Sequence, residues 1–329
     1  MFAMRTWGGV DIIARRAVAG LTAVVLSACA TGLLVACSEP ADDGVDHLDV
    51  GIVPVIDVAP LYLGIDRGFF AAQRLKLTPK PSQAGATVTA AVVAGDEQIG
   101  FSNNTSLLIA ASKGVPLRIV AAGNQAAGGD YAAIFARDDS GITAPSDLAG
   151  KRIAVNNLGN VGPLTVNAGL EASGVDISGV QFVEIPFPQM GAALTQRRID
   201  AAWAVEPFAS AIKQGGGVHV VMRPYPLIAA HFPVASYFTG TAYAKSDPDV
   251  VRRFRTAMNR SLTYAQNHPA EVRRILPSYI DLPPEVAAHV VLPEWSPDVG
   301  APLLRRTADL ARRYGYLTTE PDVARLTGG

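Results

Sequence analysis

The residues of this chain that could do chemistry are small amides and hydroxyls in two loops, each placed before an expected helix. In order along the chain, the members of the two loops are Asn103, Asn104, Thr105, Asn156, Asn160, Val161 and Gly162. Free backbone N–H groups and the helix dipole at a helix N-terminus attract an anionic group. Asn and Thr also cap helices, which explains either loop taken alone. Because the same loop type occurs in both halves of the chain, the pair predicts a polar solute held in a cleft between them.

Four further side chains extend this hypothesis. Trp203 and Glu206 lie at the end of the expected strand 201–205; Trp203 could offer a flat apolar wall, and Glu206 could accept a hydrogen bond from an amine or a ring N–H. The alternatives are a packed core tryptophan and a carboxylate at the start of a helix. Asp57 belongs to a third loop, 53–57, between the first expected strand and the first expected helix, and it could meet a cation or simply form a turn. Tyr62 could stack on an aromatic solute. Weaker candidates near the same cleft are Gln189, Asn124 and Tyr131.

The composition excludes several classes of function. Arginine is missing from the candidate loops, so a bidentate guanidinium clamp is not expected, and a sulfonate would be held by helix N-termini. The net charge of -1 gives no electrostatic basis for binding nucleic acid. The five histidines are scattered without metal-ligand spacing, and no Gly-x-Ser-x-Gly motif is present. We therefore expect no metal, no cofactor and no catalytic residue.

The elements that must position these loops alternate between strands and helices. Apolar runs with strand character alternate with helix-length segments that end at glycine, which is typical of mostly parallel sheets covered by helices. The expected strands are 48–52, 76–79, 98–101, 117–122, 152–155, 180–185, 201–205 and 218–222. The expected helices are 60–68, 87–94, 106–113, 162–172, 190–196, 207–214, 249–267, 284–292 and 303–314, with a short turn of helix at 145–148.

The first part of the chain has the pattern of an export signal. Arg15 and Arg16 precede the uncharged run 17–36, which ends in Leu-Val-Ala before Cys37. This ending resembles a bacterial lipoprotein signal, in which the cysteine carries the lipid. Cys29 closes a similar motif, but cleavage there would leave an apolar stretch after the lipid, so we favour Cys37. An uncleaved membrane anchor is the remaining alternative, since the run is long enough to span a bilayer.

Several motifs follow one another in a fixed order over more than half of the chain: GIVP at 51–54, APLYLG at 59–64, RGFF at 67–70, GDEQIG at 95–100, GVPL at 114–117, DLAGKRIAV at 147–155, and the segments 193–202 and 206–207. In these motifs the chain resembles the periplasmic binding proteins of ABC importers for sulfonates, nitrate, taurine and thiamine precursors. The resemblance implies an α/β fold of two lobes, a type II periplasmic-binding-protein fold, that closes over its ligand by a hinge. It also implies a small-molecule solute and an ABC permease as partners.

These expectations divide the chain into four parts. Residues 1–36 form the signal peptide, 37–47 a flexible tether, 48–136 with 237–329 the first lobe, and 137–236 the second lobe. Hinge crossings are expected near 136–138 and 235–237. The mature protein is expected to be a monomer outside the cytoplasm, tethered by lipid to the outer face of the cytoplasmic membrane.

Three alternatives remain open at this level. The solute is taurine-like or sulfonate-like, or it is an aromatic compound such as a pyrimidine precursor of thiamine that stacks on Trp203 or Tyr62. A pyrimidine-synthase branch of the resemblance would be an enzyme, but it needs cysteine and histidine near the cleft. The folded part contains no cysteine and the candidate loops contain no histidine. A sensory lipoprotein on the same fold is the third reading.

Overall fold

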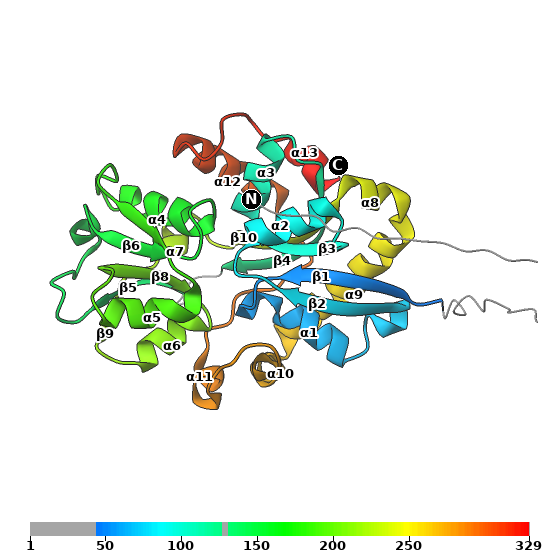
Figure 1. Cartoon of the computed structure of the whole chain (residues 1–329), viewed down its shortest axis with the longest axis horizontal. Helices are drawn as coiled ribbons and strands as arrows, with labels where there is room; N and C mark the ends of the chain where they lie inside the picture. The colour runs from blue at the N-terminus through cyan, green and yellow to red at the C-terminus, as the bar shows by residue number, and fades with distance from the viewer. Residues whose placement is uncertain (1–43, 127–130, 329) are drawn as a thin grey trace, which may run out of the picture. The chain divides into compact units, whose positions relative to one another are not determined.

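The computed structural model describes residues 44–126 and 131–328, and these form two five-stranded sheets flanked by helices (Figure 1). The first sheet has the order β2-β1-β3-β10-β4 and the second the order β7-β6-β8-β5-β9. The strands of the first sheet are β1 (Asp46–Ile52), β2 (Leu75–Pro81), β3 (Ile99–Asn103), β4 (Leu117–Ala126) and β10 (Phe232–Gly240). Those of the second sheet are β5 (Ala132–Arg137), β6 (Arg152–Val155), β7 (Gln181–Glu184), β8 (Ala201–Val205) and β9 (Val218–Met222).

Each sheet is mostly parallel, with one reversed strand. In the first sheet β1 pairs in parallel with β2 and β3, whereas β10 runs antiparallel to both β3 and β4. In the second sheet β6 pairs in parallel with β7 and β8, whereas β5 runs antiparallel to both β8 and β9. The reversed strand is in each case the one that the chain forms first after leaving the other sheet. This arrangement confirms the predicted α/β class with mostly parallel sheets.

The helices cover the sheets on both faces. They are α1 (Ala59–Asp66), α2 (Gly85–Ala94), α3 (Asn104–Ser112), α4 (Val161–Ala172), α5 (Phe187–Thr195), α6 (Phe208–Gln214), α7 (Pro224–Ile228), α8 (Thr241–Ser246), α9 (Pro248–Asn267), α10 (Pro269–Ile275), α11 (Pro284–His289), α12 (Ala301–Arg313) and α13 (Val323–Thr327). Short 3₁₀ turns lie at η1 (Ile56–Val58), η2 (Ala71–Gln73), η3 (Pro145–Leu148) and η4 (Leu276–Ser278). After β10 the chain returns to the first sheet, where α9 and α13 contact β4 and α9 also contacts β2.

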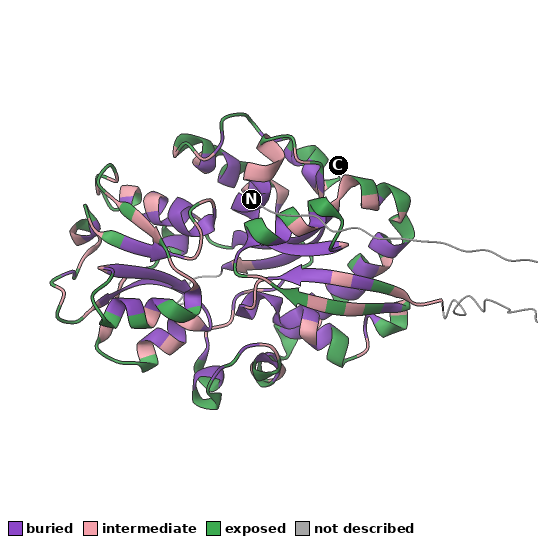
Figure 2. Ribbon diagram, in the orientation of Figure 1, coloured by how far each residue is buried: buried purple, intermediate pink, exposed green. Residues whose placement is uncertain are grey.

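Local sequence accounts for most of these elements. Gly95 follows α2 with a φ of 86°, a left-handed conformation that favours glycine at a helix end. In α9, Pro248 occupies the first turn, and buried side chains recur every three or four residues from Val250 to Ala265. Figure 2 shows the consequence: the inner strands are buried along most of their length, the edge strands β2, β7 and β9 are partly exposed, and most helices are buried on one side only. None of the described helices combines the length and the apolar character needed to cross a bilayer.

Two strands depart from the sequence expectation. All residues of β5 are buried except Arg137, and all residues of β10 are buried except Gly240. Both strands are covered on two faces, so neither shows the alternation that identifies a half-buried strand. The segments 136–138 and 235–237, expected as crossings, therefore lie within or at the end of strands. The chain changes sheets earlier, between β4 and β5 and again before β10.

Other boundaries also shift. The chain enters β1 at Asp46, so the last residues of the expected tether belong to the first sheet. The predicted signal peptide and both candidate lipidation sites, Cys29 and Cys37, lie outside the described residues. We keep the two-lobe division as a proposal, with the first lobe built on the first sheet and the second lobe on the second.

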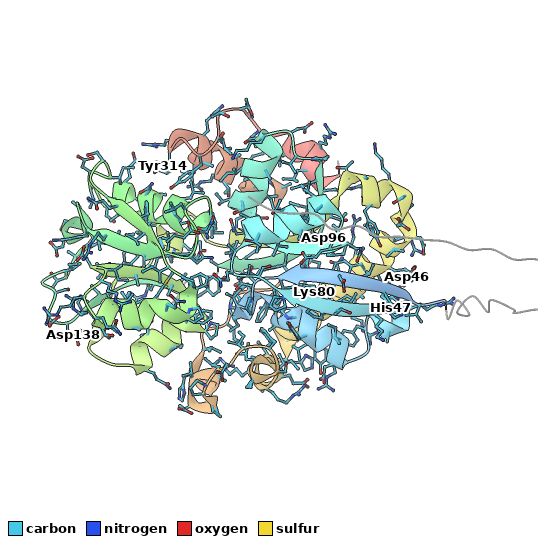
Figure 3. The ribbon with its side chains drawn as sticks, viewed as in Figure 1. Asp46, His47, Lys80, Asp96, Asp138 and Tyr314 are labelled. Atoms are coloured by element: carbon cyan, nitrogen blue, oxygen red, sulfur yellow. The ribbon has the colours of Figure 1, made fainter. Side chains whose placement is uncertain are left out.

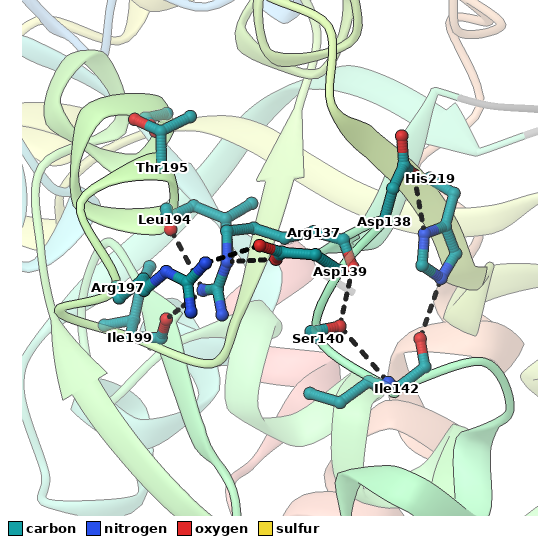
Figure 4. Close-up of polar contacts among 11 residues, drawn as sticks. Arg137, Asp138, Asp139, Ser140, Ile142, Leu194, Thr195, Arg197, Ile199 and His219 are labelled. Carbon is teal, nitrogen blue, oxygen red and sulfur yellow. Dashed lines mark hydrogen bonds and ion pairs between the residues drawn. The ribbon is translucent and has the colours of Figure 1, made fainter.

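Polar contacts hold the outer end of the second sheet. Arg137 closes β5, and its guanidinium donates to the backbone oxygens of Leu194 at 3.2 Å and Ile199 at 3.5 Å (Figure 4). His219 lies 3.0 Å from the carboxylate of Asp138 through its Nδ1 atom. Figure 3 shows Asp138 at the outer end of this sheet, away from the first sheet. This end therefore provides positions at which charge can be changed without touching the candidate site.

Candidate functional site

A small cavity of about 50 Å³ lies where loops from the two sheets meet. Its walls combine aliphatic and aromatic side chains with amides, hydroxyl groups and one carboxylate. The lining residues are Val53, Val55, Asp57, Gly85, Phe101, Asn103, Tyr131, Asn156, Asn160, Val161, Phe187, Trp203, Val205, Tyr225, Val234 and Ala235. Both sheets contribute to this wall. Val53, Val55, Asp57 and Gly85 lie in segments that follow strands of the first sheet, and the lining residues from Asn156 to Tyr225 lie in or between elements of the second sheet.

The cavity lies at the carboxyl ends of parallel strands. Asp57 follows β1, Asn103 ends β3, Asn156 follows β6, and Val205 ends β8, two residues after Trp203. In open α/β sheets this edge is where loops and helix starts converge on a ligand. The loops predicted from the sequence at 53–57, 102–106 and 156–162 therefore all reach one place.

Asp57 is held by a buried chain of hydrogen bonds. The hydroxyl of Tyr131 donates to its Oδ1 atom at 2.6 Å, and the side-chain amide of Asn124 donates to the Tyr131 oxygen at 3.0 Å. Asp57 is only 5% exposed, and burial raises the pKa of its carboxyl from 3.8 to about 7, although the bond from Tyr131 opposes this rise. Burial likewise raises the pKa of Tyr131, which keeps this hydroxyl protonated as a donor.

Two amides in the cavity wall also cap helices. Asn103 accepts from the backbone N–H of Ser106 at 2.9 Å at the start of α3, and Asn160 accepts from that of Gly162 at 2.8 Å at the start of α4. Ser106 in turn donates its hydroxyl to the backbone oxygen of Gly159 at 2.9 Å. This last bond joins the two loops across the cavity. The sequence presented helix capping and ligand contact as alternatives for these residues. In the structure Asn103 and Asn160 each cap a helix and also line the cavity.

Trp203 forms one wall of the cavity and presents an unsatisfied donor. Its ring is tilted against Phe187, with centroids 5.9 Å apart, and packs directly on the first turn of α4. A Cβ at Gly162 would lie 2.8 Å from Cε3 of Trp203, so only glycine lets the ring approach this closely. The indole Nε1 of Trp203 and the hydroxyl of Tyr225 are buried without a hydrogen-bond partner among the described residues. Each such group costs stability until an acceptor reaches it.

Five predicted site residues lie outside the cavity wall. The ring of Tyr62 stacks on that of Tyr279, with the ring centroids 4.0 Å apart, and Tyr62 does not line the cavity. Asn104 is buried and donates to the backbone oxygen of Pro233 at 3.0 Å. Thr105 is fully buried beneath the same loop, and its hydroxyl has no partner in the described chain. The others are Gly162, which supports Trp203, and Glu206.

Glu206 takes a structural position near the start of α6, close to the alternative weighed from the sequence. Its carboxylate is fully buried and accepts from the hydroxyl of Ser210 at 2.8 Å and from the backbone N–H of Val291 at 3.1 Å. Its backbone oxygen accepts from the N–H of Ile56 at 3.2 Å, one residue before Asp57. Burial raises the pKa of Glu206, and the hydrogen bonds oppose this rise. The side chain thus joins β8 to two other segments of the chain and does not face the cavity.

A larger cleft of about 270 Å³ adjoins the cavity and shares Val53 and Phe187 with it. Gln189, one of the weaker candidates, lines this cleft, whereas Tyr131 lines the cavity itself. No lysine, arginine or histidine lines either space among the residues that the structure describes. No group of three potential metal ligands occurs in 44–126 and 131–328.

The sequence reasoning missed several aromatic members of the wall. Phe187 follows the rule used for the polar loops, because it lies just beyond the carboxyl end of β7, and that rule could have found it. Phe101 lies in the middle of β3, where the rule does not apply. Tyr225 could not be found in this way, because it belongs to α7, a short helix that the sequence pattern did not indicate.

Comparison with known proteins places this arrangement in a family. Residues 55–272 match the model of a protein family described as NMT1/THI5 like. Over 246 residues the chain is 26% identical to the taurine-binding periplasmic protein of Escherichia coli, covering 74% of this chain and 70% of that protein. Over 227 residues it is 23% identical to the riboflavin-binding protein RibY of Chloroflexus aurantiacus, covering 68% of this chain and 63% of that protein.

A solved structure shows the same fold. The alkanesulfonate-binding protein SsuA from Xanthomonas axonopodis pv. citri, solved bound to MOPS, matches with a TM-score of 0.73 and 21% identity. The match covers 85% of this chain and 97% of that chain. The predicted periplasmic-binding-protein fold is thereby confirmed.

Proposed function

Because this chain belongs to the NMT1/THI5-like family, we propose that it captures a small solute in the cavity and delivers it to an ABC importer. The observation that carries this proposal is the composition of the cavity wall, to which the first sheet's side contributes the carboxylate of Asp57 and the second sheet's side contributes the indole N–H of Trp203, which has no partner among the described residues. A solute that reaches Asp57 from one sheet and Trp203 from the other would join the two lobes. Hinge closure converts such occupancy into a shape that a permease recognises.

A taurine-like or sulfonate-like solute is the first candidate. The relatives include a taurine-binding protein, and the starts of α3 and α4 both reach the cavity, where a helix dipole favours a negative group. In this proposal the sulfonate lies toward Asn103 and Asn160.

An aromatic solute is the second candidate, and a specific observation favours it. Phe101, Phe187, Trp203 and Tyr225 together give the cavity flat apolar walls on which a ring could stack. A pyrimidine precursor of thiamine or a related heterocycle would fit this description, and one relative is a riboflavin-binding protein.

We further propose that the protein acts outside the cytoplasm, held at the membrane through a lipid on Cys37. Its relatives include a periplasmic protein, and the N-terminal sequence has the pattern of a lipoprotein signal. A Cys37→Ser variant is expected to lose both the lipid and its recovery in the membrane fraction. Retention of both, seen by mass spectrometry of extracted protein, would assign the lipid to Cys29, whereas membrane retention without lipid would indicate an uncleaved anchor.

Thermal-shift screening of the purified protein tests the solute-binding proposal. Taurine, ethanesulfonate, nitrate, an aminopyrimidine and riboflavin form the panel, and a true ligand raises the melting temperature in a concentration-dependent way. A Trp203→Ala variant is expected to lose that response and serves as the matched control. If no member of the panel shifts the melting temperature at millimolar concentration, the solute-binding proposal fails.

An enzymatic role receives less support from the cavity. Among the described residues its wall contains neither cysteine nor histidine, which the pyrimidine-synthase alternative needs. The sensory alternative shares the same ligand site and differs only in the partner. Loss of solute uptake in cells lacking this protein would favour transport.

A further inference from the structure

Resting on the proposed solute-binding function, we infer that the cavity selects a solute with a nitrogen-bound proton, which Asp57 accepts. Oxyanions without such a proton bind more weakly. The inference concerns the ligand class of the same site, and it comes from the charge and hydrogen bonding of the cavity wall.

The first argument is the charge of the wall. Asp57 is the one acidic side chain among the lining residues that the structure describes, and no basic side chain accompanies it there. A bare oxyanion entering the cavity would meet a carboxylate with no protein cation between them. A solute that brings its own N–H group, or a full ammonium, supplies the missing positive partner.

The second argument is the orientation of the carboxylate. Tyr131 bonds one oxygen of Asp57, and Asn124 holds Tyr131 from behind. No other side chain of the described chain hydrogen-bonds this carboxylate, so it retains acceptor capacity on the cavity side. A charge-assisted hydrogen bond from nitrogen is among the stronger interactions available to such a group.

The third argument is the set of groups around Asp57. Among the described residues, the side chains whose titration is coupled to Asp57 are those of Tyr131, Tyr225, Tyr237 and Tyr279. Burial raises the pKa of each of these hydroxyls, so all four stay neutral near pH 7. None of them can balance the charge of an ionised Asp57, which leaves that role to the solute.

The opposite wall defines the other end of the solute. The indole N–H of Trp203 is only a donor, and it has no acceptor in the described chain. The solute therefore carries an acceptor as well as an N–H group. A taurine-like zwitterion and an aminopyrimidine both satisfy this description, the first with a sulfonate and the second with a ring nitrogen.

Matched pairs of probes test the inference by calorimetry on the purified full chain. Taurine is compared with ethanesulfonate, which keeps the sulfonate and lacks the amine, and 4-aminopyrimidine is compared with pyrimidine. Each probe is titrated into the wild type, Asp57→Asn and Asp138→Asn. Asp57→Asn keeps the size of the side chain and an acceptor for Tyr131, and Asp138→Asn makes the same change at the outer end of the second sheet.

The expected result is binding of the amine-bearing member of one pair, with the partner at least tenfold weaker. Asp57→Asn should weaken that binding by roughly 10- to 100-fold, and Asp138→Asn should leave it unchanged. If the taurine pair shows this difference in affinity, the solute carries an alkyl ammonium; if the pyrimidine pair shows it, the solute carries an aromatic amine. Equal binding of both members of a pair to the wild type and to Asp57→Asn would overturn the inference and leave solute binding intact. Absence of binding by all four probes, together with no thermal shift from riboflavin or nitrate, would instead reject the proposed function.

Discussion

Trp203 rests on Gly162 so closely that a single added carbon at residue 162 would lie 2.8 Å from the indole ring. This contact links the wall of the cavity to the start of α4, where Asn160 caps the helix. The position of the indole N–H therefore depends on a residue that does not line the cavity itself.

A Gly162→Ala variant should displace this ring. We expect solute affinity to fall about tenfold, because the Trp203 donor moves away from its acceptor, while the free energy of unfolding falls by about 1–3 kcal/mol from overpacking. Gly159→Ala is the control, since a Cβ there would meet nothing closer than 3.7 Å. Equal affinities of the two variants, measured by calorimetry, would contradict this role of Gly162.

Asp57 should make the stability of the protein depend on pH. Its pKa is about 7 in the folded chain and 3.8 ordinarily, so the folded state binds the proton more tightly than the unfolded state. Stability from this group is thus complete below about pH 4 and is lost as pH rises through about 7, by roughly 4 kcal/mol at most. Asp57→Asn should remove this loss. Urea titrations of the wild type and of Asp57→Asn at pH 5 and pH 8 test this prediction. If the stability of the two proteins changes equally with pH, Asp57 is not the group responsible.

Changes at Glu206 should lower the free energy of unfolding more than they lower solute affinity. Glu206→Ala leaves Ser210 and the N–H of Val291 without their acceptor, which costs about 2–4 kcal/mol in the free energy of unfolding. Glu206→Gln keeps an acceptor oxygen and should lose less. Chemical denaturation of the two variants measures the difference. A Glu206→Ala protein as stable as the wild type but unable to bind solute would restore the ligand role expected from the sequence.

A second link between the two halves lies at the surface. The hydroxyl of Tyr314, just beyond α12, donates to Glu171 in α4, and Arg313 pairs with the same carboxylate. Burial raises the pKa of Tyr314 to about 12, so it remains a donor at neutral pH. Figure 3 shows Tyr314 beside the helices at this border.

Removing this link should speed solute release. Because α12 packs on α3 and α4 packs on α7, the Glu171 contacts favour the arrangement in which the cavity is enclosed. We expect Tyr314→Phe combined with Glu171→Gln to raise the solute dissociation rate about two- to fivefold, as exposed ion pairs are weak. Arg312→Ala is the control, because Arg312 pairs with Asp309 on its own helix. An unchanged rate in stopped-flow measurements would show that the link does not restrain opening.

The sequence alone determined the α/β class, the resemblance to binding proteins, and the loops that reach the cavity. Those features depend on local patterns: period-two strands, helix caps such as Asn103 and Asn160, and glycine at helix ends such as Gly95. Local patterns are readable because each involves residues a few positions apart. The loops carrying Asp57 and Asn156 were predicted for the same reason.

Tertiary structure alone decided which side chains in those loops face the cavity. Trp203 and Glu206 lie three residues apart and were expected to act together, yet one lines the cavity and the other bonds Val291, far along the chain. The reversed strands β5 and β10 and the wall residue Tyr225 were hidden for the same reason. Their environment is created by segments distant in sequence, and a buried side chain is defined by the partners that surround it, which no local pattern contains.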